Sequence, residues 1–282
     1  MNILHAIILG IIQGLSEFIP ISSTAHLTIA GKLFGLISAE HPEEWTAFIA
    51  VLQLGTIAAV LVFFRKRIIS ICFSFFKDVF IERKSYSSVA HDTKLGWFVI
   101  IGTLPVVTIG IALKKIIEGS ITKNLWMIAI NLFVFAIILA VAEKFSTHTR
   151  PMEKISLRDA IAIGCAQVFA LFPGASRSGV TMSAGLFSGL TRETAAEFSF
   201  LLSIPAIVGS GILELRESLQ QQHSFGGVET FIGTLTAGIV GYASIWFLLH
   251  YLKTHTNALF IAYRIALGII ICGLLLFSII PA

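Results

Sequence analysis

The chain has 282 residues, of which 56% are hydrophobic and only 13% are charged, and its mean hydropathy is +0.88. A typical soluble domain has about 25% charged residues, so too few polar groups are present to cover a water-soluble surface. Three cysteines cannot form a disulfide framework. The apolar content excludes a disordered chain, and a net charge of +4 without a basic run beside stacking aromatics does not indicate nucleic-acid binding. What remains is an all-α polytopic membrane protein.

The first apolar stretch, Met1 to Leu15, lacks the features of a cleavable signal. No Lys or Arg precedes it and no small-residue cleavage site follows, so we expect it to remain in the mature protein. The three cysteines, Cys72, Cys165 and Cys272, lie in apolar surroundings and are expected to be buried thiols.

Six stretches are long and apolar enough to cross a bilayer, which takes about 20 mostly apolar residues. In chain order they are Trp45–Phe64, Leu95–Leu113, Asn124–Ala142, Thr194–Leu213, Val228–Leu249 and Leu259–Ile280. A shorter stretch, Ile68–Val79, is predicted to be an amphipathic helix at the membrane interface. Two more apolar regions, Ile3–Phe34 and Leu157–Leu190, are interrupted by Gly, Pro and polar residues. Such breaks are tolerated at membrane depth only inside protein or beside a wet cavity, so both regions are predicted to be re-entrant helix–loop–helix pairs.

The loop charges predict the orientation of the six spans. One side receives Arg65, Lys66, Arg67, Lys77, Arg83, Lys84, Lys94, Lys144, Arg150, Lys154, Arg158 and Lys253. The other side receives Lys32, Lys114, Lys115, Lys123 and Arg216. Because basic loops stay in the cytoplasm, the first set is predicted to be cytoplasmic and both termini are predicted to lie outside.

The two broken regions resemble each other. Ala6–Gly31 aligns without gaps onto Ala160–Gly185, with identities that include Gln13/Gln167 and Ser22/Ser176. Each broken pair is followed by three spans, so the two halves enter the membrane from opposite faces and form an inverted-topology repeat. Repeat one covers residues 1–142 and repeat two residues 157–282 of a single integral membrane domain. The alternative is that two Gly- and Ala-rich segments match by composition.

The first break carries Glu17 and His26, which are costly at membrane depth and are therefore functional candidates. Gln13 and Glu17 are four residues apart and share one helix face, where their oxygens could hold a hard divalent cation. Pro20 precedes three hydroxyl residues, and one of these is expected to cap the next half-helix. The three hydroxyl residues are Ser22, Ser23 and Thr24.

The second break reads Pro-Gly-Ala-Ser-Arg-Ser-Gly-Val-Thr from Pro173 to Thr181. Its glycines allow a tight turn and close approach to a ligand, and consecutive N–H groups at a helix start bind anions. Arg177 adds a planar fork that matches phosphate oxygens. The remaining predicted phosphate-binding residues are Gly174, Ser176, Ser178 and Thr181 of this break and Ser22 and Thr24 of the first break. If the two breaks meet, they supply what phosphoryl transfer needs: positioning and charge stabilisation.

Structural explanations of the same residues stay open. Glu17 and Arg177 could form a buried ion pair without a catalytic role, His26 could be a satisfied interior histidine, and the serines could serve helix packing. Arg264, in the last apolar stretch, is expected either to extend toward the membrane surface or to line the cavity.

The two motifs resemble the signatures of the bacterial undecaprenyl-diphosphatase family, the bacitracin-resistance proteins. The resemblance rests on Gln13 to Phe18, Pro20 to His26 and Pro173 to Thr181, and it extends along the chain to Glu197 and to Tyr263-Arg264. It implies a plasma-membrane hydrolase that converts undecaprenyl diphosphate to undecaprenyl phosphate and inorganic phosphate. Such an enzyme recycles the lipid carrier for peptidoglycan, supports cell-wall biogenesis and cell shape, and confers bacitracin resistance from a cavity that opens to the outer face.

The resemblance also implies residue roles. Glu17 matches the essential acidic residue, a metal ligand or base, while Ser23 and His26 match the catalytic hydroxyl and imidazole. The phosphate-binding motif corresponds to Ser176, Arg177 and Thr181, with Arg177 also counted as catalytic. A divalent cation, Mg²⁺ or Ca²⁺, is implied. Gln13 stands where many members have a second Glu, which weakens a two-carboxylate metal site here.

A rival class is a secondary-type transporter or flippase of a lipid phosphate or another anion, since broken helices in inverted repeats are usual in carriers. A carrier needs an anion site but no adjacent Ser, His and Glu, which favours the enzyme. Small-residue faces at Gly209–Gly211 and Gly238–Gly241 permit a homodimer without requiring one.

Overall fold

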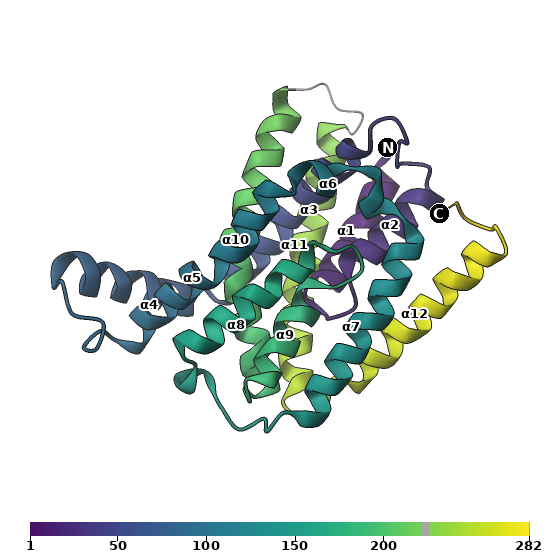
Figure 1. Cartoon of the computed structure of the whole chain (residues 1–282). Helices are drawn as coiled ribbons and strands as arrows, with labels where there is room; N and C mark the ends of the chain where they lie inside the picture. Colours follow the sequence, from purple (N-terminus) through teal and green to yellow (C-terminus); the bar gives the residue numbers. More distant parts are fainter. Residues whose placement is uncertain (221–225, 282) are drawn as a thin grey trace.

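The computed structural model describes residues 1–220 and 226–281, and the side chains of residues 213–220 lie outside the described part. The α-helices are α1 Ile3–Phe18, α2 Ser23–Leu33, α3 Pro42–Phe63, α4 Arg65–Phe76, α5 His91–Ala112, α6 Lys114–Glu118, α7 Leu125–Phe145, α8 Leu157–Gln167, α9 Arg177–Phe187, α10 Arg192–Gln220, α11 Gly227–Leu252 and α12 Ala258–Leu276. Short helical turns are η1 Lys77–Ile81, η2 Ser120–Lys123, η3 Met152–Lys154 and η4 Val168–Leu171. Within these residues the fold is helical, without a named strand (Figure 1).

Six helices are long and apolar enough to cross a membrane, which confirms that part of the sequence prediction. They are α3, α5, α7, α10, α11 and α12. Each overlaps its expected stretch, and the bounds differ by a few residues: most helices begin or end beyond the apolar stretch, whereas α12 ends at Leu276, before the expected Ile280. Pro42 starts α3 in the first turn, where a missing N–H costs nothing. The expected charge at Arg216 lies outside the described side chains.

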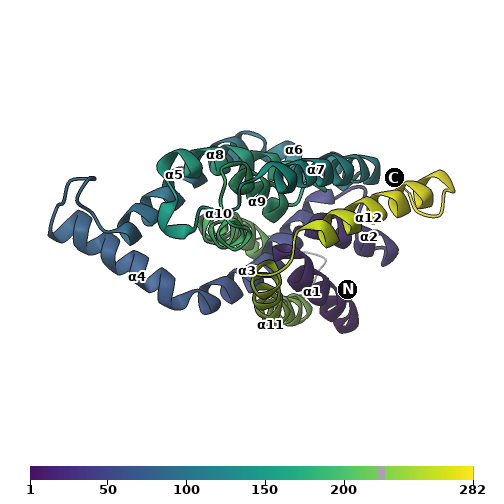
Figure 2. The same cartoon turned by 90° about the horizontal axis from the view of Figure 1, so that it is seen from below.

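The two broken regions form short hairpins whose turns lie within the bundle, while α1 and α8 each keep an exposed face on its outside. The first hairpin consists of α1 and α2, and the second of α8, η4 and α9. Each hairpin packs against a long helix from the other half of the chain: α1 against α11, and α8 against α5. The pairs α3 with α10 and α7 with α12 complete the bundle (Figures 1 and 2).

Glycines allow both of these crosswise contacts. A Cβ on Gly10 would lie 2.4 Å from the Gly233 carbonyl oxygen, and one on Gly164 would lie 2.2 Å from the Gly102 carbonyl oxygen. Gly10 and Gly164 occupy equivalent positions in the repeat alignment. Helices in membranes associate by such close backbone approach, so the same device fixes each hairpin to its partner helix.

The small-residue faces that could have served a dimer are largely used inside the protein. A Cβ on Gly211 would lie 2.4 Å from Leu54 Cδ2, and one on Gly238 would lie 3.0 Å from the Gly55 carbonyl oxygen. Both contacts are with α3. Gly241 likewise faces Thr56 and Ala59 of α3, and also Phe18 of α1. These glycines therefore explain how α10 and α11 pack against α3.

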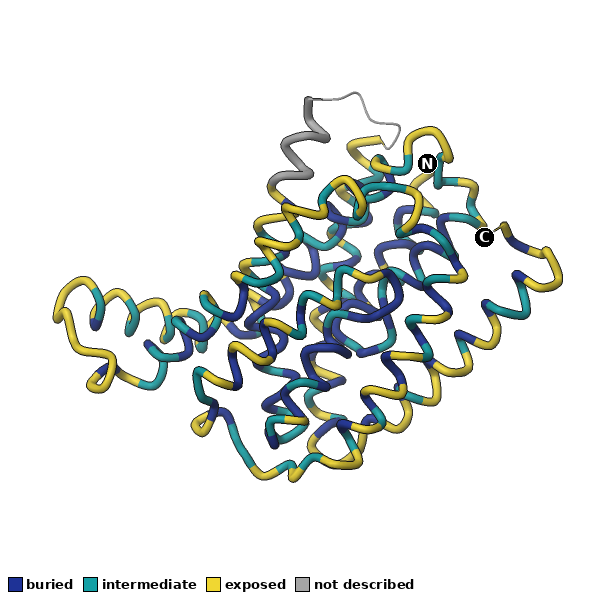
Figure 3. The backbone as a smooth tube through the Cα atoms, viewed as in Figure 1, coloured by how far each residue is buried: buried dark blue, intermediate teal, exposed yellow. Residues whose placement is uncertain are grey.

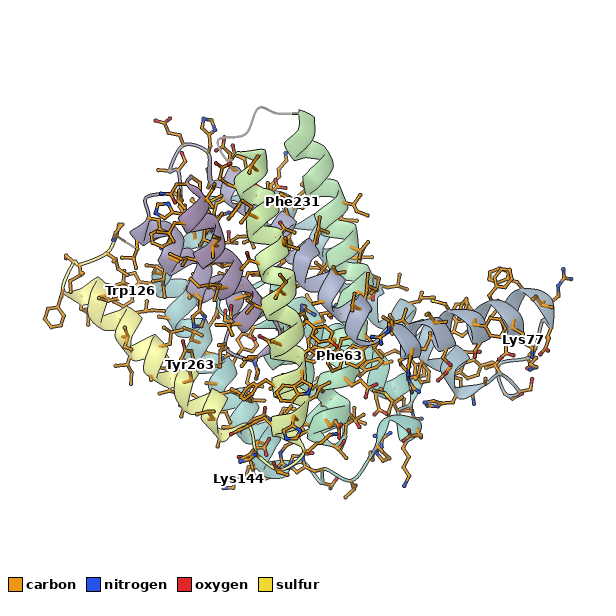
Figure 4. The ribbon with its side chains drawn as sticks, turned by 180° about the vertical axis from the view of Figure 1, so that it is seen from behind. Phe63, Lys77, Trp126, Lys144, Phe231 and Tyr263 are labelled. Carbon is orange, nitrogen blue, oxygen red and sulfur yellow. The ribbon has the colours of Figure 1, made fainter. Side chains whose placement is uncertain are left out.

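The expectation of three buried thiols is wrong. Cys72 and Cys165 are exposed and Cys272 is half-buried. The outer surface of the bundle is itself apolar, as exposed side chains such as Phe231 and Trp126 show (Figures 3 and 4). Apolar neighbours in the sequence therefore do not separate the core from the outer surface in a protein of this class.

Helix α4, η1 and the start of α5 extend away from the bundle as an arm (residues 65–95), with Lys77 at its far end (Figures 2 and 4). Phe75 of the arm packs against Trp97, further along α5, with ring centroids 5.0 Å apart. The opposite face of α4 and η1 exposes apolar side chains. These are Ile69, Phe73, Phe76 and Phe80. The helix expected over residues 68–79 is therefore present, and its interfacial placement stays a prediction.

Asp78 closes the arm. Its Oδ2 accepts hydrogen bonds from the Ala90 N–H at 2.8 Å and from Thr93 Oγ1 at 2.7 Å, and its Oδ1 accepts one from Lys84 Nζ at 2.9 Å. The Ala90 N–H foremost, with Lys84 and Thr93, lowers the pKa of Asp78 to about 2. The loop between η1 and α5 is thus tied to one carboxylate.

Candidate active site

Both inner hairpins turn at a serine with an unusual backbone conformation. Ser22 caps α2 with φ 76° and ψ 96°, and Ser176 caps α9 with φ 69° and ψ 108°. Each hydroxyl accepts a hydrogen bond at 3.3 Å from the N–H three residues on, at Ala25 and Gly179. A positive φ at a residue with a Cβ costs about 1–3 kcal/mol and clusters at functional sites. The expectation that one hydroxyl of the first break caps α2 is confirmed, and the capping residue is Ser22.

Glu17 is the centre of the site. It is 4% exposed and accepts three side-chain hydrogen bonds. Its Oε2 accepts from Gln13 Nε2 and from Ser23 Oγ, both at 2.9 Å, and its Oε1 accepts from Arg177 Nη2 at 2.7 Å. Ser23 and Arg177 are the first residues of α2 and α9 and align with each other in the repeat. The two hairpins therefore hold one carboxylate between equivalent positions.

A cavity of about 420 Å³ lies over this carboxylate. Glu17, Ser23 and Arg177 line it, together with Thr24 and Ser176. Apolar residues from α3, α5, η4 and α10 form its walls. Examples are Ile49, Val106, Val107, Leu171 and Ile207. Residues of α6 and η2, including Lys114 and Lys123, line the end nearest the chain termini (Figure 1). The cavity thus joins a charged site to an apolar wall, as a lipid with a charged head group requires.

Two buried polar atoms beside Glu17 have no hydrogen-bond partner in the part of the chain that the structure describes. They are Arg177 Nη1 and Gln13 Oε1. Unsatisfied buried groups cost about 1–3 kcal/mol each, more when charged, and a ligand in the cavity could satisfy them. Arg177 thus uses one nitrogen to hold Glu17 and keeps another donor available.

The donor set fits a divalent cation only in part. Among the described residues no group of three or more His, Cys, Asp or Glu side chains could hold a metal ion. Glu17 supplies one carboxylate and Gln13 one unpartnered amide oxygen. Mg²⁺ commonly binds through one or two carboxylates while substrate phosphates and waters fill the other positions. These two residues therefore fit a cation that is shared with a phosphate ligand.

His26 faces away from Glu17. Its Nδ1 lies 2.7 Å from the Ser22 carbonyl oxygen. Its Nε2 lies 2.6 Å from the hydroxyl of Tyr263 on α12 (Figure 4). A carbonyl oxygen only accepts, so Nδ1 carries the proton, and in the neutral ring Nε2 accepts from Tyr263. His26 is absent from the cavity lining. In this arrangement it orients the start of α2 rather than contacting the Ser23 hydroxyl.

Several predicted phosphate-binding residues lie beneath the cavity. Ser178 and Thr181 are fully buried. Ser178 Oγ donates to the Ile19 carbonyl at 3.4 Å, whereas Thr181 Oγ1 donates to the Arg177 carbonyl at 2.8 Å. Gly174, with φ +89°, packs so closely that a Cβ would lie 2.5 Å from a backbone oxygen of α7. None of these three lines the cavity, so their contacts shape the second turn.

Arg264 was the residue that sequence reasoning could not place, and neither expected position is correct. It is fully buried and is not part of the cavity lining. Its Nη2 donates to the carbonyls of Gly174 and Ala175 at 3.1 and 2.9 Å, and its Nη1 donates to the Pro20 carbonyl at 3.3 Å. Arg264 therefore ties the two breaks to each other. The only available signal was a charge in an apolar stretch, which did not reveal its partners.

This arrangement defines a class of protein: a multi-pass membrane protein with an acid, a hydroxyl and a guanidinium gathered in an internal cavity. Residues 6–270 match the family described as bacitracin resistance protein BacA, and the chain belongs to that family. It is 53% identical over 272 residues to an undecaprenyl-diphosphatase of Syntrophobacter fumaroxidans, covering 95% of both chains. It is 46% identical over 275 residues to an undecaprenyl-diphosphatase of Myxococcus xanthus, covering 98% of this chain and 90% of the relative.

Proposed function

We propose that the protein is an integral-membrane phosphatase that hydrolyses undecaprenyl diphosphate to undecaprenyl phosphate and inorganic phosphate. Relatives that carry this activity in their names match nearly the whole chain. The single observation that carries the proposal is the contact of Glu17 with both Ser23 and Arg177 inside one cavity. A carrier would need the guanidinium but not a hydroxyl hydrogen-bonded to a carboxylate, so the transporter reading is not favoured.

The proposed topology is an inverted repeat with two re-entrant hairpins. Helices α2, α8 and α9 have 11 residues each, too few to cross a bilayer. Ser22 and Ser176 share their backbone conformation and capping bond. Gly10 and Gly164 share their close contact with a helix of the other half. Shared composition alone would not reproduce these contacts at aligned positions.

Charge segregation supports an outward-facing cavity. The predicted outer residues Lys32, Lys114 and Lys123 belong to the end of the bundle that holds α6 and both termini, whereas the segment 146–156 with Arg150 and Lys154 lies at the opposite end (Figure 1). The cavity reaches the α6 end. With the positive-inside rule, this supports our proposal that both termini and the cavity mouth face the outside of the plasma membrane.

The contacts around Glu17 support the following proposed mechanism. Arg177 Nη1 binds the terminal phosphate while the apolar wall takes the first part of the prenyl chain. Glu17 accepts the proton of Ser23, or of a water that Ser23 orients, as the oxygen attacks the terminal phosphorus. The anhydride P–O bond breaks and undecaprenyl phosphate leaves with the bridging oxygen. Attack by Ser23 would form a phosphoserine that water then hydrolyses, whereas attack by water releases phosphate directly.

A divalent cation would be held by Glu17 and Gln13. When bound it would neutralise phosphate charge in the transition state. Arg177 would add positive charge directly beside Glu17.

The first test is phosphate release from undecaprenyl diphosphate by the purified protein in detergent. We expect turnover in the wild type, its loss with EDTA and recovery with Mg²⁺ or Ca²⁺, and loss of activity by a factor on the order of 10³ in Glu17→Ala. Ser23→Ala separates the two nucleophiles: trapping of a phosphoserine in the wild type supports direct attack, and full activity of Ser23→Ala excludes it. A wild type that binds the lipid without releasing phosphate would contradict the proposal.

A further inference from the structure

Gln167, the last residue of α8, is the most unusual polar side chain that the mechanism above does not use. It is fully buried, and neither its Nε2 nor its Oε1 has a hydrogen-bond partner among the described residues. Buried polar atoms in native proteins are nearly always paired, and each unpaired one costs about 1–3 kcal/mol. A side chain that keeps both amide atoms unpaired therefore calls for an explanation.

The position of Gln167 supplies one. It lines the same cavity as Glu17 and Arg177, and Arg177 Nη1 is also unpaired and buried. Two donors without partners, one charged and one neutral, thus border one space. Phosphate oxygens accept several hydrogen bonds at once, and such donors are worth most where water is excluded.

The repeat explains why this amide is unpaired. Gln167 aligns with Gln13, and Gln13 donates its Nε2 to Glu17 four residues later at 2.9 Å. In the second hairpin the position equivalent to Glu17 is Leu171, which cannot accept a hydrogen bond. Gln13 of the first hairpin therefore donates to Glu17, whereas Gln167 of the second hairpin has no such acceptor one turn later.

We propose that Gln167 is a substrate-binding residue of the hydrolase, an inference that rests on the proposed function. Its Nε2 donates to a non-bridging oxygen of the terminal phosphate that Arg177 Nη1 also binds. Its Oε1 accepts a hydrogen bond from the water that hydrates or attacks this phosphate. The amide adds a directed donor without changing the charge of the site.

The decisive variant is Gln167→Met, which preserves length and volume but removes both polar atoms. Because those atoms have no internal partners, we expect an unchanged or higher Tm, while kcat/KM for undecaprenyl diphosphate falls by a factor on the order of 10 to 100, the value of one hydrogen bond to a charged group. Ile163→Met, one turn earlier on α8 and equally buried, is the matched control and should retain near wild-type Tm and kcat/KM.

Gln167→Glu adds a readout that a structural role would not produce. A carboxylate here repels phosphate, but a protonated carboxyl has the shape of the amide and one donor. The ratio of its kcat/KM to that of the wild type, measured at each pH, should therefore rise as the pH is lowered through the pKa of the new carboxyl.

The outcomes separate the two proposals. An inactive wild type overturns the proposed function. An active wild type with Gln167→Met within twofold of its kcat/KM overturns the role of Gln167 alone. The role is also overturned if Gln167→Met lowers both Tm and kcat/KM and the ratio of kcat/KM between Gln167→Glu and the wild type does not change with pH. Those two results together would indicate that the amide has a purely structural role.

Discussion

The two inner hairpins share a scaffold and differ in chemistry. Both turn at a capping serine with positive φ, and both dock through a glycine on a helix of the other half. At the first position after the cap, however, one has Ser23 and the other Arg177, and both contact Glu17. Duplicated backbone geometry therefore positions unlike side chains on the two oxygens of one carboxylate, and the site exists only where the hairpins meet.

The largest expected effect is at Arg177, where the second hairpin differs most from the first. Arg177→Ala removes the donor to Glu17 and the donor to the cavity, and we expect phosphate release to fall by a factor on the order of 10³. Arg177→Lys keeps the charge but not the two-nitrogen fork and should recover only part of the activity. Steady-state phosphate release measures both.

Folding must be checked separately because Arg177→Ala leaves Glu17 buried without a counter-charge, which is destabilising. The double variant Glu17→Gln/Arg177→Ala removes that charge and should recover Tm without recovering turnover. Near-normal turnover in Arg177→Ala would show that the second hairpin does not bind phosphate.

Arg264 tests whether the two hairpins must be tied together. Arg264→Lys cannot reach the Pro20 carbonyl and the Gly174 and Ala175 carbonyls at once, so we expect a fall of about tenfold or more in kcat and a lower Tm. Each carbonyl left without a donor costs about 1–3 kcal/mol. Arg264→Met should be worse on both measures, and a stable, active Arg264→Met would show that the link is dispensable.

The glycine contacts test the equivalence of the two docking sites. Gly10→Ala and Gly164→Ala would each place a Cβ within 2.4 Å of a backbone oxygen on the partner helix, and overpacking of this kind costs about 1–3 kcal/mol. Gly273→Ala, with no atom within 4 Å of the new Cβ, is the control. Thermal unfolding in detergent should show similar losses for the first two and none for the control. A loss confined to one hairpin would contradict the equivalence.

The smallest effect is expected far from the hairpins, at Asp78. Its folded pKa of about 2 is below the ordinary value near 3.9. The stabilisation of the arm is therefore complete above about pH 4 and is lost as the pH falls toward 2. Amide hydrogen exchange of the segment 82–90 should accelerate in the wild type as the pH falls through that range. It should also accelerate in Asp78→Asn at neutral pH, where the rate of phosphate release should stay near that of the wild type. An unchanged exchange rate in Asp78→Asn would remove the role of this carboxylate.

Local patterns predicted the fold well where local physics decides it. Hydropathy and length located the six long apolar helices of the described residues. The three hydroxyl residues after Pro20 predicted a cap, and the structure has Ser22 in that position. The contact of Glu17 with Arg177, 160 residues apart, could be anticipated only from the proposed repeat, which predicts that the two breaks meet. Their chemical roles remain predictions that the experiments above address.

What sequence reasoning missed depends on contacts between distant elements. The partners of Arg264 are backbone carbonyls, which every residue has, so no side-chain pattern could identify them. His26 turns toward Tyr263, 237 residues later, although its spacing from Glu17 allowed either direction. Thr181 reads as a phosphate donor in the motif, yet its place on α9 directs it to a helix carbonyl and to Ser199.

The crosswise docking of the hairpins also constrains biosynthesis. Helix α1 is synthesised before the helix that it packs against, α11, residues 227–252. The α1–α2 hairpin therefore cannot make this contact until α11 has been translated. A nascent chain arrested before α11 would lack the helix against which α1, with Glu17, packs. Assembly of the pocket is therefore a late event of biogenesis.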